Sequence, residues 1–263
     1  MNRIIIAFTF LFLLTACVNS PDIKGETIET SDSEVLQEEL TLEAIIDSVY
    51  LKYGSQFIDQ SNIYFDFRDF QYAYVQDKAG LKRSRKFTND KGEEVFDLWQ
   101  GNSLVRTING KPIELIEKDE RAYMNSINSV FYFAFLPKSL KDPAVNTELV
   151  DEVEIKGKMY YKIKVTFDED GGGEDFHDIF LYWIAVEDYS MDYLAYQYFT
   201  EGGGVRFREV SKTQEVKGIL FQDYFNYGPK EDMMDDYINV DSYFSANGLK
   251  VVSEIKLENI RVE

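Results

Sequence analysis

The strongest constraint on the fold is the alternation of apolar and polar side chains along several short segments of the chain. Between residues 159 and 167, apolar side chains take every second position, and Lys162, Lys164 and Thr166 lie between them. Because successive side chains of a strand point to opposite faces, this period of two predicts a strand with one buried face and one wet face. Residues 179–186 are apolar throughout, which predicts a strand that is covered on both faces.

Turn-forming residues separate these segments from further strand candidates. Asn109-Gly110 and the glycine triplets at 171–173 and 202–204 mark turns. The other strand candidates are residues 191–199, 205–210 and 220–227. Consecutive strands joined by short turns predict an antiparallel sheet.

The segment 64–75 carries aromatic side chains in two phases of the alternation. The first two aromatic positions and the last three are out of phase along a strand: Phe65 and Phe67 against Phe70, Tyr72 and Tyr74. One strand places both sets on the same face only if it slips by one residue, so we predict a β-bulge near Arg68-Asp69. A bulge of this kind predicts a strongly curved sheet.

Two other segments follow helical spacing. Apolar residues between Leu42 and Tyr53 recur on one helical face, with Thr41 as the expected N-cap and Gly54 as the expected stop. Residues 116–135 lack alternation and present a second apolar helical face, and Pro137 blocks its continuation. We therefore predict an α+β fold in which residues 41–263 form a single domain, a strongly curved antiparallel sheet covered by about two helices.

Residues 1–16 show the order of features of an export signal. Arg3 precedes an apolar run at 4–14, and Leu14-Thr15-Ala16-Cys17 follows. A membrane-spanning helix needs about 20 apolar residues, so this run is too short to span and fits the core of a signal peptide. The tetrapeptide resembles a lipobox, which implies cleavage before Cys17 and acyl chains on that residue. The alternative is an ordinary secretory signal with a chance cysteine.

The segment that follows, residues 17–40, is predicted to be a flexible tether after the lipidated Cys17. Residues 18–39 are rich in acids and lack aromatic side chains, so they cannot bury enough apolar surface to become ordered. Cys17 is the only cysteine, so the domain must rely on its apolar core rather than on an intrachain disulfide. The net charge of −19 makes nucleic acid an unsuitable partner.

The sequence resembles an uncharacterised family of Bacteroidota lipoproteins, a domain of unknown function. The segments that carry the resemblance are Phe135-Leu136-Pro137, Leu140-Lys141-Asp142-Pro143, residues 156–167, Phe180-Leu181-Tyr182-Trp183 and Met191-Asp192-Tyr193-Leu194. The resemblance implies a fold similar to the lipoprotein carriers LolA and LolB, an open half-barrel whose apolar concave face is covered by helices. Many members have a histidine in the turn where this chain has Lys52-Tyr53-Gly54-Ser55, and the family has no established catalytic residues.

The sequence offers no recognisable catalytic constellation. His177 is the only histidine, and no nucleophile elbow, phosphate-binding glycine loop or set of zinc ligands is present. Acidic residues crowd the segment 168–178, but their spacing differs from that of a calcium-binding EF-hand loop, so a solvated hairpin tip is the favoured interpretation over a calcium site. We expect a protein that is not an enzyme and needs no metal or other cofactor.

The many aromatic side chains allow two interpretations, a closed core or the lining of a groove. The candidate ligand-lining residues are Phe131, Phe133, Trp183 and Tyr196. Our functional hypothesis is a protein anchored in the cell envelope, most simply at the outer membrane, through the acyl chains on Cys17, which binds a lipid or another apolar ligand. The alternative is a non-catalytic interaction module for a protein or glycan partner. The segment 116–135 is expected to act as a lid over the sheet.

Overall fold

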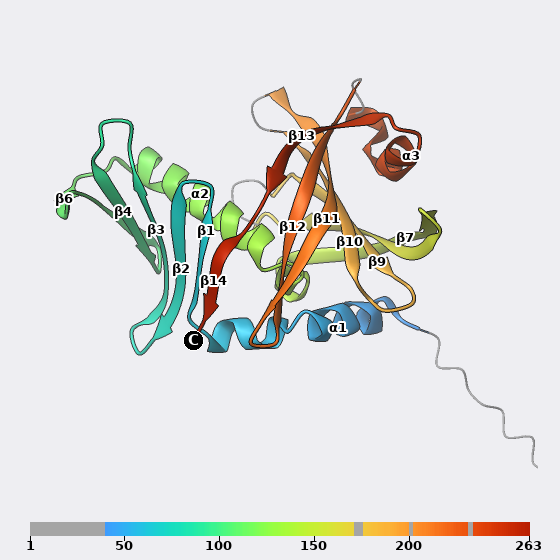
Figure 1. Cartoon of the computed structure of the whole chain (residues 1–263), viewed down its shortest axis with the longest axis horizontal. Helices are drawn as coiled ribbons and strands as arrows, with labels where there is room; N and C mark the ends of the chain where they lie inside the picture. Colours follow the sequence, from blue (N-terminus) through green and yellow to red (C-terminus); the bar gives the residue numbers. More distant parts are fainter. Residues whose placement is uncertain (1–39, 171–175, 200–201, 231–233) are drawn as a thin grey trace, which may run out of the picture. The chain divides into compact units, whose positions relative to one another are not determined.

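Fourteen strands and a few helices make up the part of the chain that this computed structural model describes, residues 40–170, 176–199, 202–230 and 234–263 (Figure 1). The α-helices are α1 (Leu42–Lys52), α2 (Glu117–Ala134) and α3 (Val240–Ser245). The 3-10 helices are η1 (Ser55–Gln60), η2 (Lys138–Lys141) and η4 (Met234–Asn239). The predicted signal peptide, Cys17 and tether lie outside these residues.

The first sheet contains seven antiparallel strands in the order β14-β1-β2-β3-β4-β5-β6. Its strands are β1 (Ile63–Phe67), β2 (Phe70–Asp77), β3 (Gly80–Thr88), β4 (Glu94–Gln100), β5 (Ser103–Ile108), β6 (Lys111–Ile113) and β14 (Glu258–Val262). The predicted Asn109-Gly110 turn joins β5 to β6, and both residues have positive φ, as a tight hairpin turn requires.

The second sheet also contains seven antiparallel strands, in the order β13-β12-β11-β10-β9-β8-β7. Its strands are β7 (Val145–Ile155), β8 (Lys158–Phe167), β9 (Ile179–Ala185), β10 (Met191–Tyr198), β11 (Gly204–Val216), β12 (Ile219–Pro229) and β13 (Leu249–Ile255). The predicted α+β class with antiparallel strands is confirmed, and the strands divide between two sheets. The chain passes between the sheets twice, through α2 and at the β13–β14 junction.

The predicted bulge near Arg68-Asp69 is wrong, because these two residues form the turn of a hairpin. Phe67 at the end of β1 pairs directly with Phe70 at the start of β2, and Arg68 has a φ of 54°. Residues opposite each other in a hairpin point to the same face. The change of phase in the sequence therefore marks a reversal of the chain, and both aromatic sets reach one face without any slip.

The predicted wet face of β8 is wrong at Lys162, whereas Lys164 and Thr166 are half-buried. Lys162 is buried, and its ammonium pairs with Asp241 of α3 and donates to the carbonyl of Ile238 in η4. The segment of η4 and α3 covers this face, and a small apolar cluster that includes Trp183 and Phe207 lies beneath it. The prediction for residues 179–186 is confirmed, because β9 lies between this cluster and the main core.

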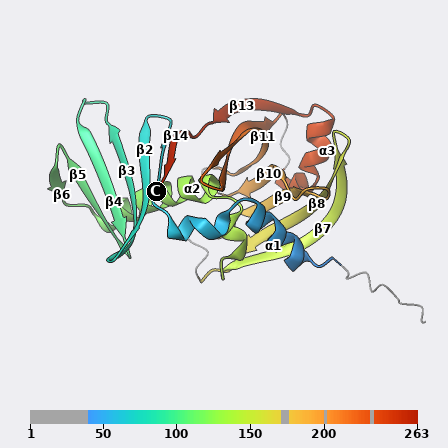
Figure 2. The ribbon, with the colours of Figure 1, turned by 60° about the horizontal axis from the view of Figure 1, so that its bottom comes forward.

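Helix α1 begins and ends as predicted. The Thr41 hydroxyl accepts a hydrogen bond from the Ala44 amide at 3.2 Å, and Gly54 follows the helix with a φ of 65°. A Cβ at Gly54 would lie 1.9 Å from the carbonyl oxygen of Gly218, so only glycine allows the β11–β12 turn to approach this closely. The helix lies beneath the second sheet in Figure 1, and Figure 2, in which the bottom comes forward, shows it in front of that sheet.

Helix α2 contacts both sheets. Its buried residues, Ile127, Val130, Phe131 and Ala134, recur at helical spacing. The Phe131 ring packs against Phe65, Tyr72 and Tyr74 of the first sheet, at centroid distances of 5.7–5.8 Å. The neighbouring ring of Tyr132 instead lies 5.5 Å from Phe180 of the second sheet. This helix is therefore the element that positions side chains toward the space between the sheets.

Candidate functional site

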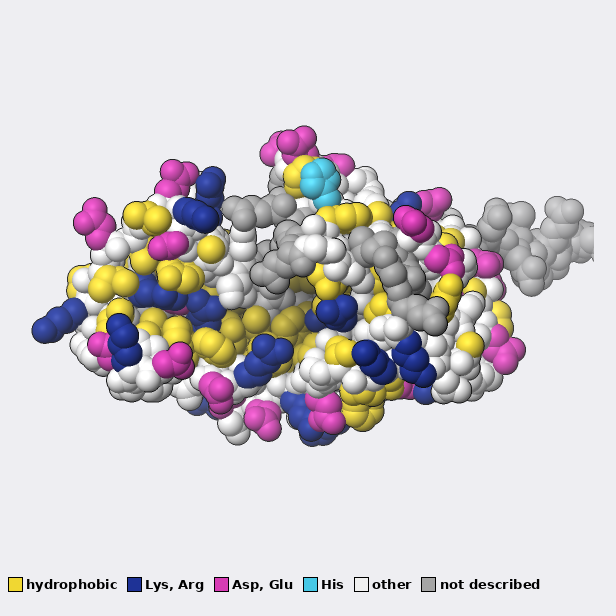
Figure 3. Space-filling view, turned by 90° about the horizontal axis from the view of Figure 1, so that it is seen from above, with side chains coloured by type: hydrophobic (Ala, Val, Ile, Leu, Met, Phe, Trp, Pro, Cys, Tyr) yellow, Lys and Arg dark blue, Asp and Glu magenta, His cyan; other side chains and the backbone are white. Residues whose placement is uncertain are grey.

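A cavity of about 530 Å³ lies between α2 and the second sheet, and we call it the main cavity. Its aromatic wall consists of Tyr132 and Phe133 from α2, Phe167 from β8, Phe180 from β9, and Tyr196 and Tyr198 from β10. Seen from above, hydrophobic side chains gather in a hollowed part of the surface, with Lys and Arg side chains beside them (Figure 3). Its volume lies within the range of about 300–1,000 Å³ that is typical of small-molecule pockets.

The register of the second sheet places a polar row beside this aromatic wall. Leu194 of β10 pairs with Arg208 of β11, Arg208 pairs with Asn226 of β12, and Asn226 pairs with Ser253 of β13. Directly paired residues share a face of the sheet, so all four side chains point toward the main cavity, which they line. The neighbouring row places Tyr196 opposite Arg206 in the same way.

Basic side chains outnumber acidic ones around the main cavity. Arg68, Arg206 and Arg208 line it, whereas Asp178 is the acidic lining residue in the described part of the chain. The Arg206 guanidinium lies 5.2 Å from the Tyr198 ring centroid, and that of Arg208 lies 5.1 Å from the Tyr196 centroid. Such cation–π contacts hold a guanidinium in place without neutralising it. The lining of the cavity thus combines aromatic side chains with cationic ones.

The buried phenols near the main cavity donate hydrogen bonds rather than act as bases. The hydroxyl oxygens of Tyr132 and Tyr182 lie 2.8 Å apart. Burial raises the pKa of Tyr132 to about 12, and it also raises the pKa of Tyr182 and Tyr224. All three phenols therefore stay protonated at neutral pH.

A smaller cavity of about 210 Å³ adjoins the main one. Asn128, Tyr132 and Phe167 line both cavities. Phe131, Tyr74 and Arg83 line only the smaller one, on the side of α2 that faces the first sheet. Tyr132 thus stands between the two spaces.

The structure separates the four residues that the sequence suggested as ligand-lining. Phe133 and Tyr196 line the main cavity. Phe131 is 3% exposed and lines only the smaller cavity. Trp183 is fully buried on the opposite face of the second sheet, beneath η4 and α3, so it lines neither. It belongs to the core, and we no longer place it among the ligand-lining candidates.

Sequence reasoning missed Arg206 and Arg208. They alternate with Val205 and Phe207, a pattern that ordinarily marks a strand with a wet outer face. In the structure the two apolar residues face the small cluster beneath α3, and the arginines face the main cavity. The two arginines could have been recognised from their position opposite the segment around Tyr196 in the sheet. That position is known only once the order of the strands is known.

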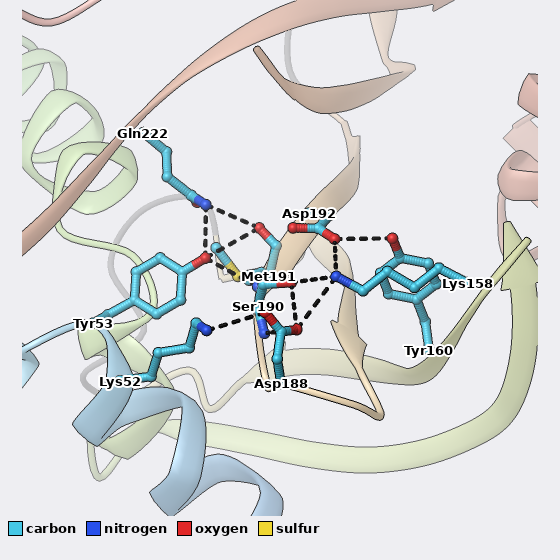
Figure 4. A network of polar contacts seen from close by, with 9 residues as sticks. All are labelled: Lys52, Tyr53, Lys158, Tyr160, Asp188, Ser190, Met191, Asp192 and Gln222. Carbon is cyan, nitrogen blue, oxygen red and sulfur yellow. Dashed lines mark hydrogen bonds and ion pairs between the residues drawn. The ribbon is translucent and has the colours of Figure 1, made fainter. Parts of the chain in front are cut away.

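A second group of polar side chains forms a network with many internal contacts. It joins the end of α1 to the β9–β10 turn and to β12 (Figure 4). The Asp188 carboxylate accepts from Lys52 at 3.2 Å, and the Tyr53 hydroxyl accepts from Gln222 at 2.6 Å and from the Met191 amide at 2.9 Å. Hydrogen bonding within the network satisfies these groups, so it holds α1 against the second sheet.

The remaining candidates also carry no site. His177 is exposed in the turn before β9, and its ring centroid lies 3.9 Å from that of Phe176, with the two rings tilted by 36°. The acidic segment 168–178 lies partly outside the described residues. Elsewhere in the described ranges, no group of three or more His, Cys, Asp or Glu side chains is arranged to hold a metal ion. None of the described helices combines the length and apolar character needed to cross a membrane.

Comparison with solved structures gives distant likenesses in fold. The chain is similar to a LolA superfamily protein from Nitrosomonas europaea, with 11% identity, a TM-score of 0.45 and coverage of 86% of this chain and 94% of that one. It is similar to a DUF1329 family protein from Desulfovibrio piger, with 11% identity, a TM-score of 0.43 and coverage of 84% and 92%. For the lipoprotein LppX from Mycobacterium tuberculosis the identity is 12%, the TM-score 0.28 and the coverage 61% and 91%.

All three TM-scores lie below 0.5, so function has to be argued from the geometry of this chain. No curated protein matches the sequence. A family model does match, over residues 31–256, which confirms the expectation of a family without assigned function. The chain belongs to the family of unknown function DUF6503.

Proposed function

We propose that this domain binds a lipid or another apolar ligand in the main cavity and performs no catalysis. The observation that carries the proposal is the aromatic wall, in which side chains from α2 and three strands surround a space of about 530 Å³ that the protein's own side chains leave unfilled. Apolar surface of this kind gains free energy when it is covered, at roughly 25 cal/mol per Å². The aromatic side chains supply that surface, and α2 closes one side of it.

The proposal extends to the N-terminal segment. Acylation of Cys17 would anchor the domain in the cell envelope, most simply at the outer membrane, and the tether 18–40 would let it reach neighbouring lipids. Two or more acyl chains anchor a protein stably, whereas one chain binds only marginally. The alternative, a non-catalytic module for a protein or glycan partner, needs no apolar cavity.

Two measurements test the proposal. Organic extraction of the purified full chain followed by mass spectrometry detects co-purifying lipid. Titration with N-phenyl-1-naphthylamine, an uncharged apolar fluorophore, measures the affinity of the cavity. We expect Ser129→Trp to reduce this affinity about tenfold or more, because Ser129 lines the main cavity from an exposed position of α2.

The matched control is Lys118→Trp, which adds the same ring to an exposed position near the start of α2, away from the cavity. It should leave the affinity unchanged. If the parent protein carries no lipid and does not bind the fluorophore, the proposal fails. Saturable binding of a glycan or protein in that case would favour the alternative.

A further inference from the structure

We infer that the ligand of the main cavity is an amphiphile with an anionic head group, and that Arg208 is the residue that recognises this group. The inference rests on the proposed function, since it names the class of ligand that the same cavity accepts. The Nε of Arg208 is buried from solvent and has no hydrogen-bond partner among the described residues.

The rest of the Arg208 guanidinium also lacks strong hydrogen bonds and a counterion within the described ranges. Its Nη2 donates one long hydrogen bond, 3.4 Å, to the Tyr196 hydroxyl. Among the ion pairs of the described residues, none includes Arg208, although Arg85 and Arg106 both pair with Asp97. Arg208 is half-buried, so its guanidinium is partly removed from water, and an external anion would complete it where no counterion of the described chain does.

Two aromatic rings hold the Arg208 guanidinium in a position where it can bind such an anion. Its carbon lies 5.3 Å from the ring centroid of Phe133 and 5.1 Å from that of Tyr196. These rings restrict the side chain and shield it from water, and both also line the main cavity. The cationic group and the apolar wall therefore face the same space, which is the arrangement that an amphiphile requires.

Asn226, the neighbouring residue in the polar row, also has a buried polar atom without a hydrogen-bond partner in the described part of the chain. Asn226 lies directly opposite Arg208, and its amide nitrogen donates to Ser253 at 3.0 Å. Its Oδ1 is buried and has no partner among the described residues. An unpartnered donor and an unpartnered acceptor side by side suit a head group that has both a charged oxygen and a hydroxyl.

Charge supports the same ligand class. The chain as a whole carries a net charge of −19, yet Arg68, Arg206 and Arg208 line the main cavity with only Asp178 opposing them among its described lining residues. A local reversal of sign on a strongly acidic protein favours an anion at that point and disfavours a cationic ligand. Carboxylates and phosphate monoesters share the required chemistry.

The test uses three probes with the same acyl chain: palmitate, palmitoyl lysophosphatidic acid and uncharged monopalmitoylglycerol. Each displaces N-phenyl-1-naphthylamine from the purified full chain, below the concentration at which the probe forms micelles. We expect at least one anionic probe to bind about tenfold more tightly than monopalmitoylglycerol, which corresponds to about 1.4 kcal/mol. The comparison of palmitate with the lysophosphatidic acid separates a carboxylate from a phosphate head group.

Arg208→Met should abolish the preference for the anionic probe and leave the affinity for monopalmitoylglycerol within about twofold. Arg261→Met is the matched control, because Arg261 is exposed on β14 and stacks on Tyr64, outside the main cavity. Arg208→Gln provides a second variant if the methionine variant does not fold, as judged by circular dichroism.

Different results would contradict the apolar cavity and the anionic head group. Equal affinity for all three probes overturns the anionic head group while the apolar cavity remains. A preference for anions that survives both Arg208 substitutions overturns the assignment of Arg208 as the residue that recognises the head group. Failure of every probe and of the fluorophore to bind overturns the proposed function and this inference with it.

Discussion

The ammonium of Lys162 and the carboxylate of Asp241 form an ion pair 2.9 Å long in which both side chains are almost fully buried, 5% and 7% exposed. The pair joins β8 to the segment that covers the outer face of the second sheet. Removing water from two opposite charges is costly, and their mutual contact, together with the hydrogen bond from Lys162 to the Ile238 carbonyl, offsets that cost.

Removing one member of this pair should therefore destabilise the protein strongly. We expect Lys162→Met to lower the free energy of unfolding by about 3–5 kcal/mol, because Asp241 is left buried without a counterion. The double variant with Asp241→Leu should recover most of this loss. Urea denaturation measures both. Lys164→Met is the control, since its contact with Glu148 is exposed and 3.8 Å long, and exposed pairs contribute about 1 kcal/mol or less.

Two neighbouring aromatic residues of α2 should separate stability from binding. Phe131→Ala should cost about 3–5 kcal/mol of unfolding free energy, because the ring is buried against the first sheet. Its affinity for N-phenyl-1-naphthylamine should change little, because Phe131 does not line the main cavity. Phe133→Ala should show the reverse, with weaker fluorophore binding and a smaller loss of stability. Parallel loss of both quantities in both variants would contradict this division.

Stability should fall in acid partly through Asp188. Burial alone would raise the pKa of this carboxyl, but hydrogen bonds from Ser190, Lys52 and Lys158 outweigh it and hold the pKa well below its usual range. The unfolded chain, with an ordinary Asp pKa of about 3.9, takes up the proton first as the pH falls. The stabilisation is therefore complete above that pKa and is lost as the pH falls toward the folded-state pKa.

This loss can be assigned by substitution. Asp188→Asn should flatten the dependence of unfolding free energy on pH below about 4. Asp90→Asn, in the exposed β3–β4 turn, is the control and should leave the slope as in the parent. An unchanged slope in Asp188→Asn would show that other carboxylates account for the acid sensitivity.

Cys17→Ala should abolish acylation and leave the protein in an unprocessed or soluble form. Fractionation of cells, combined with the mass of the purified chain, measures both properties. A serine substitution in the tether, such as Ser20→Ala, should leave processing unchanged. Recovery of a cleaved Cys17→Ala variant in the membrane fraction would refute the lipobox hypothesis.

Local features of the sequence predicted local structure well. The caps and apolar spacing located α1 and α2 to within a residue or two, because a helix is fixed by neighbours along the chain. The same holds for β9, whose apolar character on both faces is visible in eight consecutive letters. The family was also anticipated from ordered segments of sequence.

Features that depend on distant partners were missed. The sequence pattern predicted an exposed Lys162, because Asp241, its partner in the buried ion pair, lies far along the chain. The Arg68-Asp69 turn looked like a bulge because a reversal of direction and a slip by one residue give the same change of phase. The roles of Arg206 and Arg208 likewise depend on which face of β11 meets α2, and that face is set by tertiary packing.

The pairing of β1 with β14 has a consequence for the order of folding. Ile63 lies opposite Val262, so strands near the two ends of the described domain complete one sheet. One edge of β1 can bond to β2 as soon as that hairpin forms, but the other edge waits for almost the entire chain to be made. Contacts this distant in sequence form slowly, and an unpaired edge attracts other strands in the meantime. The free edge of β1 would thus stay open to aggregation until β14 has been made, and a factor that shields the nascent chain would act at β1.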